Sequence, residues 1–267
     1  MSATIKLSSP ATKEFWEIPV LFEDDHLLAL AKPAGLATSS DRTDLNRPSL
    51  MKLLHAGIAE GKPWAQQRHL TYLSNAHRLD AETSGVLVLA KSKPVLIALA
   101  NLFGEEKPLQ KYVVLAHGTP LEARFEVGGK VAPHPVTAGK WHVDSKRGKK
   151  AKTLFTPLEK FANCTLLRCE PATARPHQIR VHLQNVGWPV VGDELYGGQP
   201  LLLSRLKPHF RLKPGKTERP LLATATVHAE ELSLPHPVTG APLTITAPWP
   251  KDLTVAVKYL RLYAVAG

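Results

Sequence analysis

The chain has 267 residues, of which 43% are hydrophobic, so it can bury a sizeable core as one large domain or two small ones. Its formal net charge is +11, which favours a polyanionic partner. The longest apolar runs are far shorter than the ~20 residues needed to cross a bilayer, and residues 1–20 lack an apolar signal core. We therefore expect a cytoplasmic protein without a membrane span.

In chain order, residues 1–17 are predicted to be a loose N-terminal tail, followed by a single domain over residues 18–267. Short apolar runs that end at turn residues predict strands, and apolar residues spaced three or four apart predict helices. Strands are expected at 26–36, 86–90, 110–118, 151–158, 164–170, 223–234 and 243–248. Helices are expected from Pro48, from Pro94 to Gly104, from Pro176 to Val186, and after Pro250.

The predicted strands outnumber the helices and often follow one another directly. This order predicts an α+β domain with a mixed, mostly antiparallel sheet and flanking helices, and it argues against a doubly wound parallel sheet.

The positive charge is concentrated in two segments. The first basic segment, Gly128–Lys152, has seven Lys or Arg and one Asp, a net charge of +6. The second basic segment, Ser204–Arg219, has six and one Glu, a net charge of +5. Both fall between predicted strands, where we expect long binding loops. Such loops suit the phosphates of a nucleic acid, and the alternative is that they are solvated and bind nothing.

One polar stretch stands directly before a strand that should be buried. The sequence NAHRLDAETSG, from Asn75 to Gly85, holds four ionisable side chains, and the apolar run 86–90 follows at once. Desolvation at the edge of a core disfavours charge, so such a placement requires a compensating group or a function.

A second polar stretch, TARPHQIRVHLQNVG, places Arg175 before a short predicted helix and Arg180 near its start. Cations at a helix N-terminus oppose the helix dipole. Either an anion binds there, or a carboxylate from elsewhere pairs with one arginine, for which Asp80 is a candidate. The remaining alternative is an exposed arginine pair.

Motifs for most cofactor-dependent or metal-dependent chemistry are absent from the sequence. It contains no dinucleotide-binding or Walker glycine motif, no zinc-protease or serine-hydrolase motif, and no base-deaminase pattern. Cys164 and Cys169 would point to opposite faces of one strand and cannot pair. His77, His177 and His182 lack an acid or Cys at ligand spacing. We therefore predict neither a metal nor a cofactor.

The motifs together resemble one enzyme family. HRLDAETSG, from His77 to Gly85, closely resembles the His-Arg-Leu-Asp-x-x-Thr-Ser-Gly motif of the RluA-type pseudouridine synthases. LLALAKPAGL, KYVVLAHG, GKKAKT, RPHQIRVHL, GDELYGG, VHAEELSLPHP and APWP are similar to its other blocks and occur in the same order. The resemblance runs from about Val20 to Asp252. It does not include the additional RNA-binding domain of the S4 type that many members of the family have.

The resemblance implies the pseudouridine-synthase catalytic fold with a central active-site cleft, and the isomerisation of uridine to pseudouridine in structured RNA, either rRNA or tRNA. The base leaves C1′ of the ribose, turns, and rejoins through C5, without redox change or cofactor. A carboxylate beside C1′ can stabilise or attack the sugar. The resemblance does not identify the RNA or the uridine, and we expect a monomer.

By the same resemblance, Asp80 is the catalytic carboxylate, Arg180 pairs with it, and Tyr112 stacks on the uracil. Arg78 would fill the space that the target base leaves. Glu82 and Asp193 are expected to be structural or solvated acids. Further RNA contacts are expected from His77, Thr83, Arg175, His177, Gln178, Lys146, Arg147, Lys149 and Lys150.

Two other functions compete with this interpretation. A non-catalytic RNA-binding protein with the same fold would have no need for the set of Asp80, Tyr112 and Arg180. A base-modifying transferase would need a cofactor site, and the sequence shows no motif for one.

Overall fold

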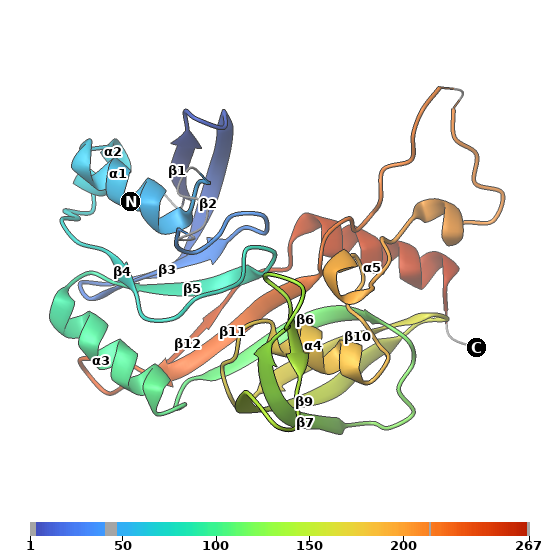
Figure 1. Ribbon diagram of the computed structural model, residues 1–267. Helices are drawn as coiled ribbons and strands as arrows, with labels where there is room; N and C mark the ends of the chain where they lie inside the picture. Colours follow the sequence, from blue (N-terminus) through green and yellow to red (C-terminus); the bar gives the residue numbers. More distant parts are fainter. Residues whose placement is uncertain (1–3, 41–46, 214, 266–267) are drawn as a thin grey trace. The chain divides into compact units, whose positions relative to one another are not determined.

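The computed structural model describes residues 4–40, 47–213 and 215–265 (Figure 1). The chain forms two compact units. The first unit comprises Met1–Gln110 and Ala229–Pro248, and the second comprises Lys111–His228 and Trp249–Gly267. Within the described residues, no helix is long and apolar enough to span a membrane.

The first unit is built on a sheet with the strand order β1-β2-β3-β5-β11. In it, β12 pairs with β11 and β4 pairs with β5, and the pairs β1–β2, β2–β3, β3–β5, β4–β5 and β11–β12 are antiparallel. The strands are β1 (Thr4–Ser9), β2 (Glu14–Glu23), β3 (Leu27–Lys32), β4 (Ser74–Asn75), β5 (Ser84–Ala90), β11 (Val227–Pro235, whose first two residues belong to the second unit) and β12 (Pro242–Thr246).

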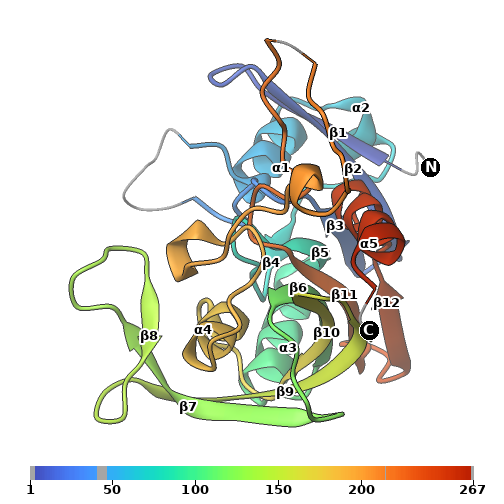
Figure 2. The ribbon, with the colours of Figure 1, turned by 90° about the vertical axis from the view of Figure 1, so that its right-hand side faces the viewer.

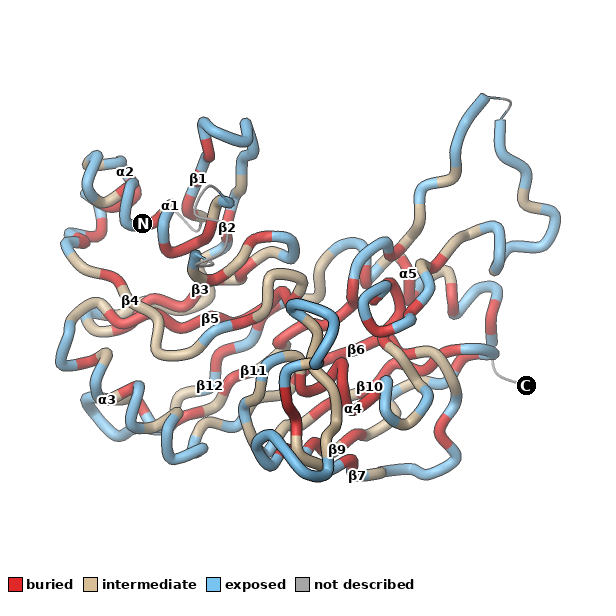
Figure 3. Tube along the Cα trace, in the orientation of Figure 1, coloured by how far each residue is buried: buried red, intermediate tan, exposed pale blue. Residues whose placement is uncertain are grey.

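The centre of this sheet is buried on both faces. All residues of β5 are buried, as the red trace in Figure 3 shows. Val86 and Val88 pack against Val95 and Leu99 of α3 (Lys93–Gly104), so α3 covers one face. The helices α1 (Leu50–Ala59) and α2 (Pro63–Gln66) complete the first unit. A fully buried strand explains the continuous apolar run of the sequence.

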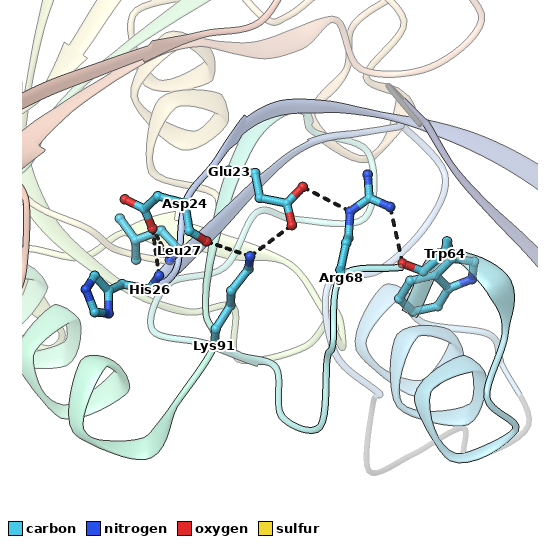
Figure 4. A network of polar contacts seen from close by, with 7 residues as sticks. All are labelled: Glu23, Asp24, His26, Leu27, Trp64, Arg68 and Lys91. Atoms are coloured by element: carbon cyan, nitrogen blue, oxygen red, sulfur yellow. Dashed lines mark hydrogen bonds and ion pairs between the residues drawn. The ribbon is translucent and has the colours of Figure 1, made fainter. Parts of the chain in front are cut away.

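A partly buried ion network holds the C-terminal end of β5 in place. Glu23 at the end of β2 accepts hydrogen bonds from Arg68 Nε at 3.0 Å and from Lys91 Nζ at 2.9 Å (Figure 4). Arg68 also donates to the carbonyl of Trp64 in α2, and Lys91 donates to the carbonyl of Asp24. The one carboxylate therefore joins three segments of the first unit.

The second unit has a sheet in the order β6-β10-β9-β7-β8, with every neighbouring pair antiparallel. Its strands are β6 (Leu109–His117, whose first two residues belong to the first unit), β7 (Phe125–Pro133), β8 (Trp141–Val143), β9 (Lys149–Lys160) and β10 (Cys164–Pro171). Its helices are α4 (Gln178–Asn185), α5 (Lys251–Tyr263) and the 3-10 turns η1 (Glu194–Tyr196) and η2 (Leu203–Arg205).

The helices α5 and α4 pack on different residues of this sheet. Val113 of β6 lies in one apolar cluster with Leu253 and Val257 of α5. In a second cluster, Val181 of α4 packs with Val131 of β7, and Figure 2 shows α4 beside β7 and β8. Because side chains alternate along a strand, Tyr112 points away from the face that α5 covers.

The α+β fold class with a mostly antiparallel sheet is confirmed, and three local predictions are wrong. Residues 4–9 and 14–23 form strands and not a loose tail. The first basic segment is not a loop, since it contains β8 and parts of β7 and β9. Pro176 precedes α4, which begins at Gln178, because His177 adopts a left-handed conformation with φ 53° at the N-cap.

Candidate active site

Asp80 lies in a short loop, residues 79–83, that is fixed by hydrogen bonds on both sides of it. On one side, Leu79 donates its amide to Thr38 Oγ1 at 3.1 Å, and the same hydroxyl donates to the Leu79 carbonyl at 2.7 Å. On the other side, the carbonyl of Ala81 accepts the amide of Gly35 at 2.8 Å. The β3 turn, residues 32–38, therefore holds the Asp80 loop in place. This is a physical role for the Lys-Pro-Ala-Gly block.

The Asp80 loop also closes on itself and on the sheet. Thr83, which is buried, donates its amide to the Asp80 carbonyl at 3.1 Å. Gly85, the second residue of β5, has a φ of 116°, and a Cβ there would lie 2.1 Å from the carbonyl oxygen of Ala229 in β11. Only glycine allows this close approach. Thr83 is almost fully buried in the first unit, so only its few exposed atoms could make the predicted contact with RNA.

Lys32 is a buried cation beside the Asp80 loop. Its side chain, 1% exposed, donates from Nζ to the carbonyls of Pro33 at 2.8 Å, Leu36 at 2.6 Å and Ala81 at 3.3 Å. Burial lowers the pKa of Lys32 to about 7, while the charges of Asp80 and Glu82 act to raise it. The sequence interpretation assigned this lysine no role.

His77 has structural partners within the first unit. Its Nε2 accepts the amide of Val88 at 3.0 Å, and its ring stacks on Phe103 with centroids 4.5 Å apart. Burial lowers the pKa of His77 to about 4, which keeps the ring neutral. Arg78, by contrast, is exposed. Of the two neighbours in the motif, Arg78 is therefore the one with a side chain available to RNA.

Arg180 forms a buried bidentate ion pair with Asp193 in the second unit. Arg180 Nε and Nη2 donate to the two carboxylate oxygens at 2.6 and 2.7 Å, and the two residues are 4% and 2% exposed. The sequence left open a bound anion, a carboxylate partner such as Asp80, or an exposed arginine pair, and the structure gives Arg180 a carboxylate partner, Asp193. Asp193 has a structural contact, as expected, but its link to Arg180 was missed.

Tyr196 supports the same arginine from another side. The guanidinium carbon of Arg180 lies 4.9 Å from the centroid of the buried Tyr196 ring, a cation–π distance. The Tyr196 hydroxyl accepts the amide of Trp141 at 2.9 Å and is 2.8 Å from His177 Nδ1. Asp193 and Tyr196 both belong to the GDELYGG block, which is the sequence signal that could have identified them.

Gln178 is buried, and its amide group is used within the second unit. Its Nε2 donates to the carbonyl of Lys152 at 3.0 Å and to Thr153 Oγ1 at 2.9 Å, and its Oε1 accepts from Thr173 Oγ1 at 2.8 Å. Through these bonds Gln178 anchors α4 on β9.

Arg175 and His177 flank the start of α4. Arg175 is half-buried, and its Nε donates to the carbonyl of Lys150 at 3.0 Å, which joins the segment before α4 to β9. His177 is half-buried beside Tyr196. Arg175 therefore lies next to the positively charged start of β9. His177 lies next to Tyr196, whose ring packs on Arg180.

Tyr112 is nearly buried, with 9% of its surface exposed, and it lies opposite Cys169 in the β6–β10 ladder. Asp80 belongs to the first unit, whereas Tyr112 and Arg180 belong to the second.

The first basic segment presents its cations on a defined hairpin. Asp144 Oδ1 accepts the amides of Lys146 and Arg147 at 2.8 and 3.1 Å, which fixes the turn that carries them. Lys149 and Lys150 follow in β9, and all four cations are exposed. Lys150 lies directly opposite Lys130 in β7, and like charges facing each other across strands are destabilising. Such an arrangement is relieved by an anion.

The second basic segment has little regular structure. Beyond η2, its described residues form an irregular loop, drawn largely pale blue in Figure 3, and its six cations are exposed. Ser204 donates its amide to Glu218 at 2.8 Å and so draws the ends of the loop together. Among the residues that the structure describes, no group of three or more His, Cys, Asp or Glu could hold a metal ion.

Comparison with known proteins connects these features to one family. Residues 26–185 match the family model described as RNA pseudouridylate synthase. Ribosomal large subunit pseudouridine synthase D of Nitrosomonas europaea is 34% identical over 91% of this chain, which spans 65% of that protein. The D synthase of Zymomonas mobilis is 30% identical, with coverage of 97% and 78%, and the C synthase of Escherichia coli is 32% identical, with coverage of 91% and 70%.

Two solved structures share the fold. Human RNA Pseudouridylate Synthase Domain Containing 4 has a TM-score of 0.66 at 23% identity, with coverage of 91% of this chain and 92% of that chain. Human RNA Pseudouridylate Synthase Domain Containing 1 has a TM-score of 0.62 at 20% identity, with coverage of 94% and 97%.

Proposed function

Because the chain belongs to the RNA pseudouridylate synthase family, we propose that it isomerises particular uridines of large-subunit ribosomal RNA to pseudouridine. The observation that carries the proposal is the Asp80 loop: hydrogen bonds on both sides of Asp80 fix the main chain that carries its carboxylate, in the motif that resembles the family's catalytic block. The relatives named as large-subunit synthases support ribosomal RNA as the target, and tRNA is the second candidate.

In this proposal Asp80 acts at C1′ of the target uridine. Cleavage of the glycosidic bond leaves positive character on the sugar, which a carboxylate stabilises or captures covalently. The uracil then turns, a new bond forms from C5 to C1′, the C5 proton is lost, and N1, which has left C1′, takes up a proton. Tyr112 stacks on the uracil, and Arg180 pairs with Asp80, as the family resemblance implies.

The contacts of Arg180 are compatible with that role. Asp193 binds Nε and Nη2 of the guanidinium and fixes its plane. A guanidinium has five N–H donors, so the bidentate pair with Asp193 does not exhaust it. Asp193 would then orient Arg180 for the proposed pair with Asp80.

We propose that both basic segments bind the RNA backbone, including through Lys146, Arg147, Lys149 and Lys150. Their exposure and the facing pair Lys130 and Lys150 support this, because phosphates remove the repulsion between like charges. We further propose that the chain works as a monomer in the cytoplasm.

The experiment is a reaction of the purified chain with unmodified large-subunit ribosomal RNA and, in parallel, with unmodified tRNA, each labelled with tritium at C5 of uridine. The expected result is tritium release from the ribosomal RNA, with pseudouridine mapped to a few positions. Tritium release from tRNA alone would mean that tRNA, and not ribosomal RNA, is the target. RNA binding without release from either would favour the competing function, a non-catalytic RNA-binding protein.

A further inference from the structure

Lys32 places an ionisable amine in the interior of the first unit, where charge is costly to the fold. An isolated ammonium in an apolar interior is strongly disfavoured, and such a group loses its proton unless partners hold it. Lys32 is 1% exposed at the end of β3, and the charged groups that face it among the described residues are Asp80 and Glu82. A buried cation beside the candidate catalytic carboxylate therefore calls for a functional explanation.

The hydrogen bonds of Lys32 match the charged form of the side chain. An ammonium has three N–H donors, and Nζ has three carbonyl partners, on Pro33, Leu36 and Ala81. A neutral amine has two N–H donors and a lone pair. On losing its proton, Lys32 would turn that lone pair toward one carbonyl oxygen, and the longest hydrogen bond, 3.3 Å to Ala81, would be given up first.

Ala81 is the neighbour of Asp80, and its carbonyl is shared between Lys32 and the amide of Gly35. Deprotonation of Lys32 therefore loosens the Asp80 loop on one side and at the same time removes a positive charge near the carboxylate. We propose that the Lys32 ammonium is a positioning residue that clamps the Asp80 loop to the β3 turn and holds a positive charge near the Asp80 carboxylate. This inference rests on the proposed function. It makes Lys32 a second cation beside Asp80, in addition to Arg180.

The proposal gives the site a defined dependence on pH. Lys32, whose pKa is lowered to about 7 by burial, should lose its charge as the pH rises through that value. The reaction rate should therefore fall on the alkaline side. We call this fall in rate the alkaline limb of the pH–rate profile. Glu82 is one of the two charges that raise the pKa of Lys32, so Glu82→Gln should move the alkaline limb to lower pH.

The first measurement needs no substrate. Lys32→Met keeps an unbranched side chain that is one atom shorter and removes the charged amine. Amide hydrogen exchange should be about tenfold or more faster in this variant at Gly35 and Thr83, which donate to the Ala81 and Asp80 carbonyls. Lys91→Met is the matched control, since Lys91 is another lysine with little exposure at an end of the same sheet but bonds to Glu23 and Asp24. It should leave exchange at Gly35 and Thr83 unchanged.

The second measurement is the single-turnover rate of pseudouridine formation at saturating enzyme between pH 6 and 8.5. Lys32→Met should be slower on the order of 10²-fold at pH 6.5, the usual effect of a misplaced catalytic group, and should lack the alkaline limb. If Lys32→Met does not fold, wild type and Glu82→Gln still test the limb and its shift.

The possible outcomes distinguish the role of Lys32 from the proposed enzymatic function. Unchanged exchange at Gly35 and Thr83 in Lys32→Met, or an alkaline limb that Glu82→Gln does not move, overturns the role of Lys32. Faster exchange in Lys32→Met without any loss of rate also overturns it. Faster exchange together with a wild-type protein that forms no pseudouridine leaves the clamp standing and refutes the proposed function.

Discussion

Asp193 holds Arg180 through both carboxylate oxygens, at 2.6 and 2.7 Å, in a place where both residues are almost fully buried. Removing one partner of a buried pair leaves an uncompensated charge, typically at a cost of about 3–5 kcal/mol. Asp193→Asn should therefore lower the free energy of unfolding by about 3 kcal/mol and also lower the reaction rate, measured by denaturant unfolding and single-turnover kinetics.

Glu159→Gln is the matched control for that variant. Glu159 also binds an arginine through both oxygens, but the pair with Arg261 is exposed. Exposed pairs contribute about 0–1 kcal/mol, so this variant should be nearly neutral in stability and rate. Equal effects of the two variants would contradict a special role for the Asp193 pair.

Asp80→Asn should abolish pseudouridine formation, with a loss of at least about 10³-fold, because the amide neither stabilises nor captures the sugar cation. Folding and RNA binding should persist, since the loop bonds of Leu79, Ala81 and Thr83 use main-chain atoms of that segment. Tritium release and a binding titration measure both. Glu82→Gln, in the same loop, should remain active at pH 6, and a clearly active Asp80→Asn would refute the mechanism.

The hydroxyl of Tyr196 accepts a hydrogen bond and its ring contacts Arg180, and two substitutions distinguish these contributions. Tyr196→Phe keeps the ring beneath Arg180 but deprives the Trp141 amide of its acceptor, at a cost of about 1–3 kcal/mol in stability. Tyr196→Leu also removes the cation–π interaction with Arg180. We expect the single-turnover rate to fall more in Tyr196→Leu than in Tyr196→Phe. Equal rates in the two variants would mean that the ring does not position Arg180.

The first basic segment should determine how strongly RNA binding depends on salt. Replacing Lys146, Arg147, Lys149 and Lys150 with Gln should weaken binding. It should also flatten the slope of log K against log salt, by about 0.7–0.9 for each phosphate that the variant no longer neutralises. The single-turnover rate on bound RNA should change little.

A control with the same change of charge replaces the exposed Lys6, Lys13, Lys62 and Lys107 of the first unit with Gln. Its salt slope should remain close to that of the wild type. If both quadruple variants behave alike, the effect is one of net charge alone, and the hairpin does not touch the phosphates directly.

His77 should make the fold sensitive to acid. Because the folded-state pKa of His77 is lowered to about 4, the unfolded chain binds more protons between pH 6.5 and pH 4. Stability should therefore be full above pH 6.5 and fall through this window, by up to about 3 kcal/mol from His77. His77→Gln keeps an acceptor for the Val88 amide without titrating. Urea unfolding across the window should show a smaller loss in this variant than in the wild type.

The sequence alone determined the family, the fold class and most secondary structure. The continuous apolar run predicts β5, and apolar residues three or four positions apart predict α3. Both can be recognised locally, because the faces that an element buries determine where its apolar residues fall in the sequence. The strands β1, β2, β7 and β8 were missed. β1 has only two apolar residues, and β2 has apolar residues at consecutive positions without a clear alternation. The charges in and around β7 and β8 are typical of loops.

Candidate residues within one motif could be found from sequence, but their partners could not. The HRLD motif identified Asp80 by resemblance, and the position of Arg180 against its helix dipole showed that it needed a carboxylate. That the carboxylate in the second unit is Asp193, that Tyr196 supports the same guanidinium, and that Lys32 lies beside the Asp80 loop were decided by tertiary structure. Pairing between residues 13 to 49 positions apart depends on how the chain folds back on itself, and no local pattern of charge or hydrophobicity records it.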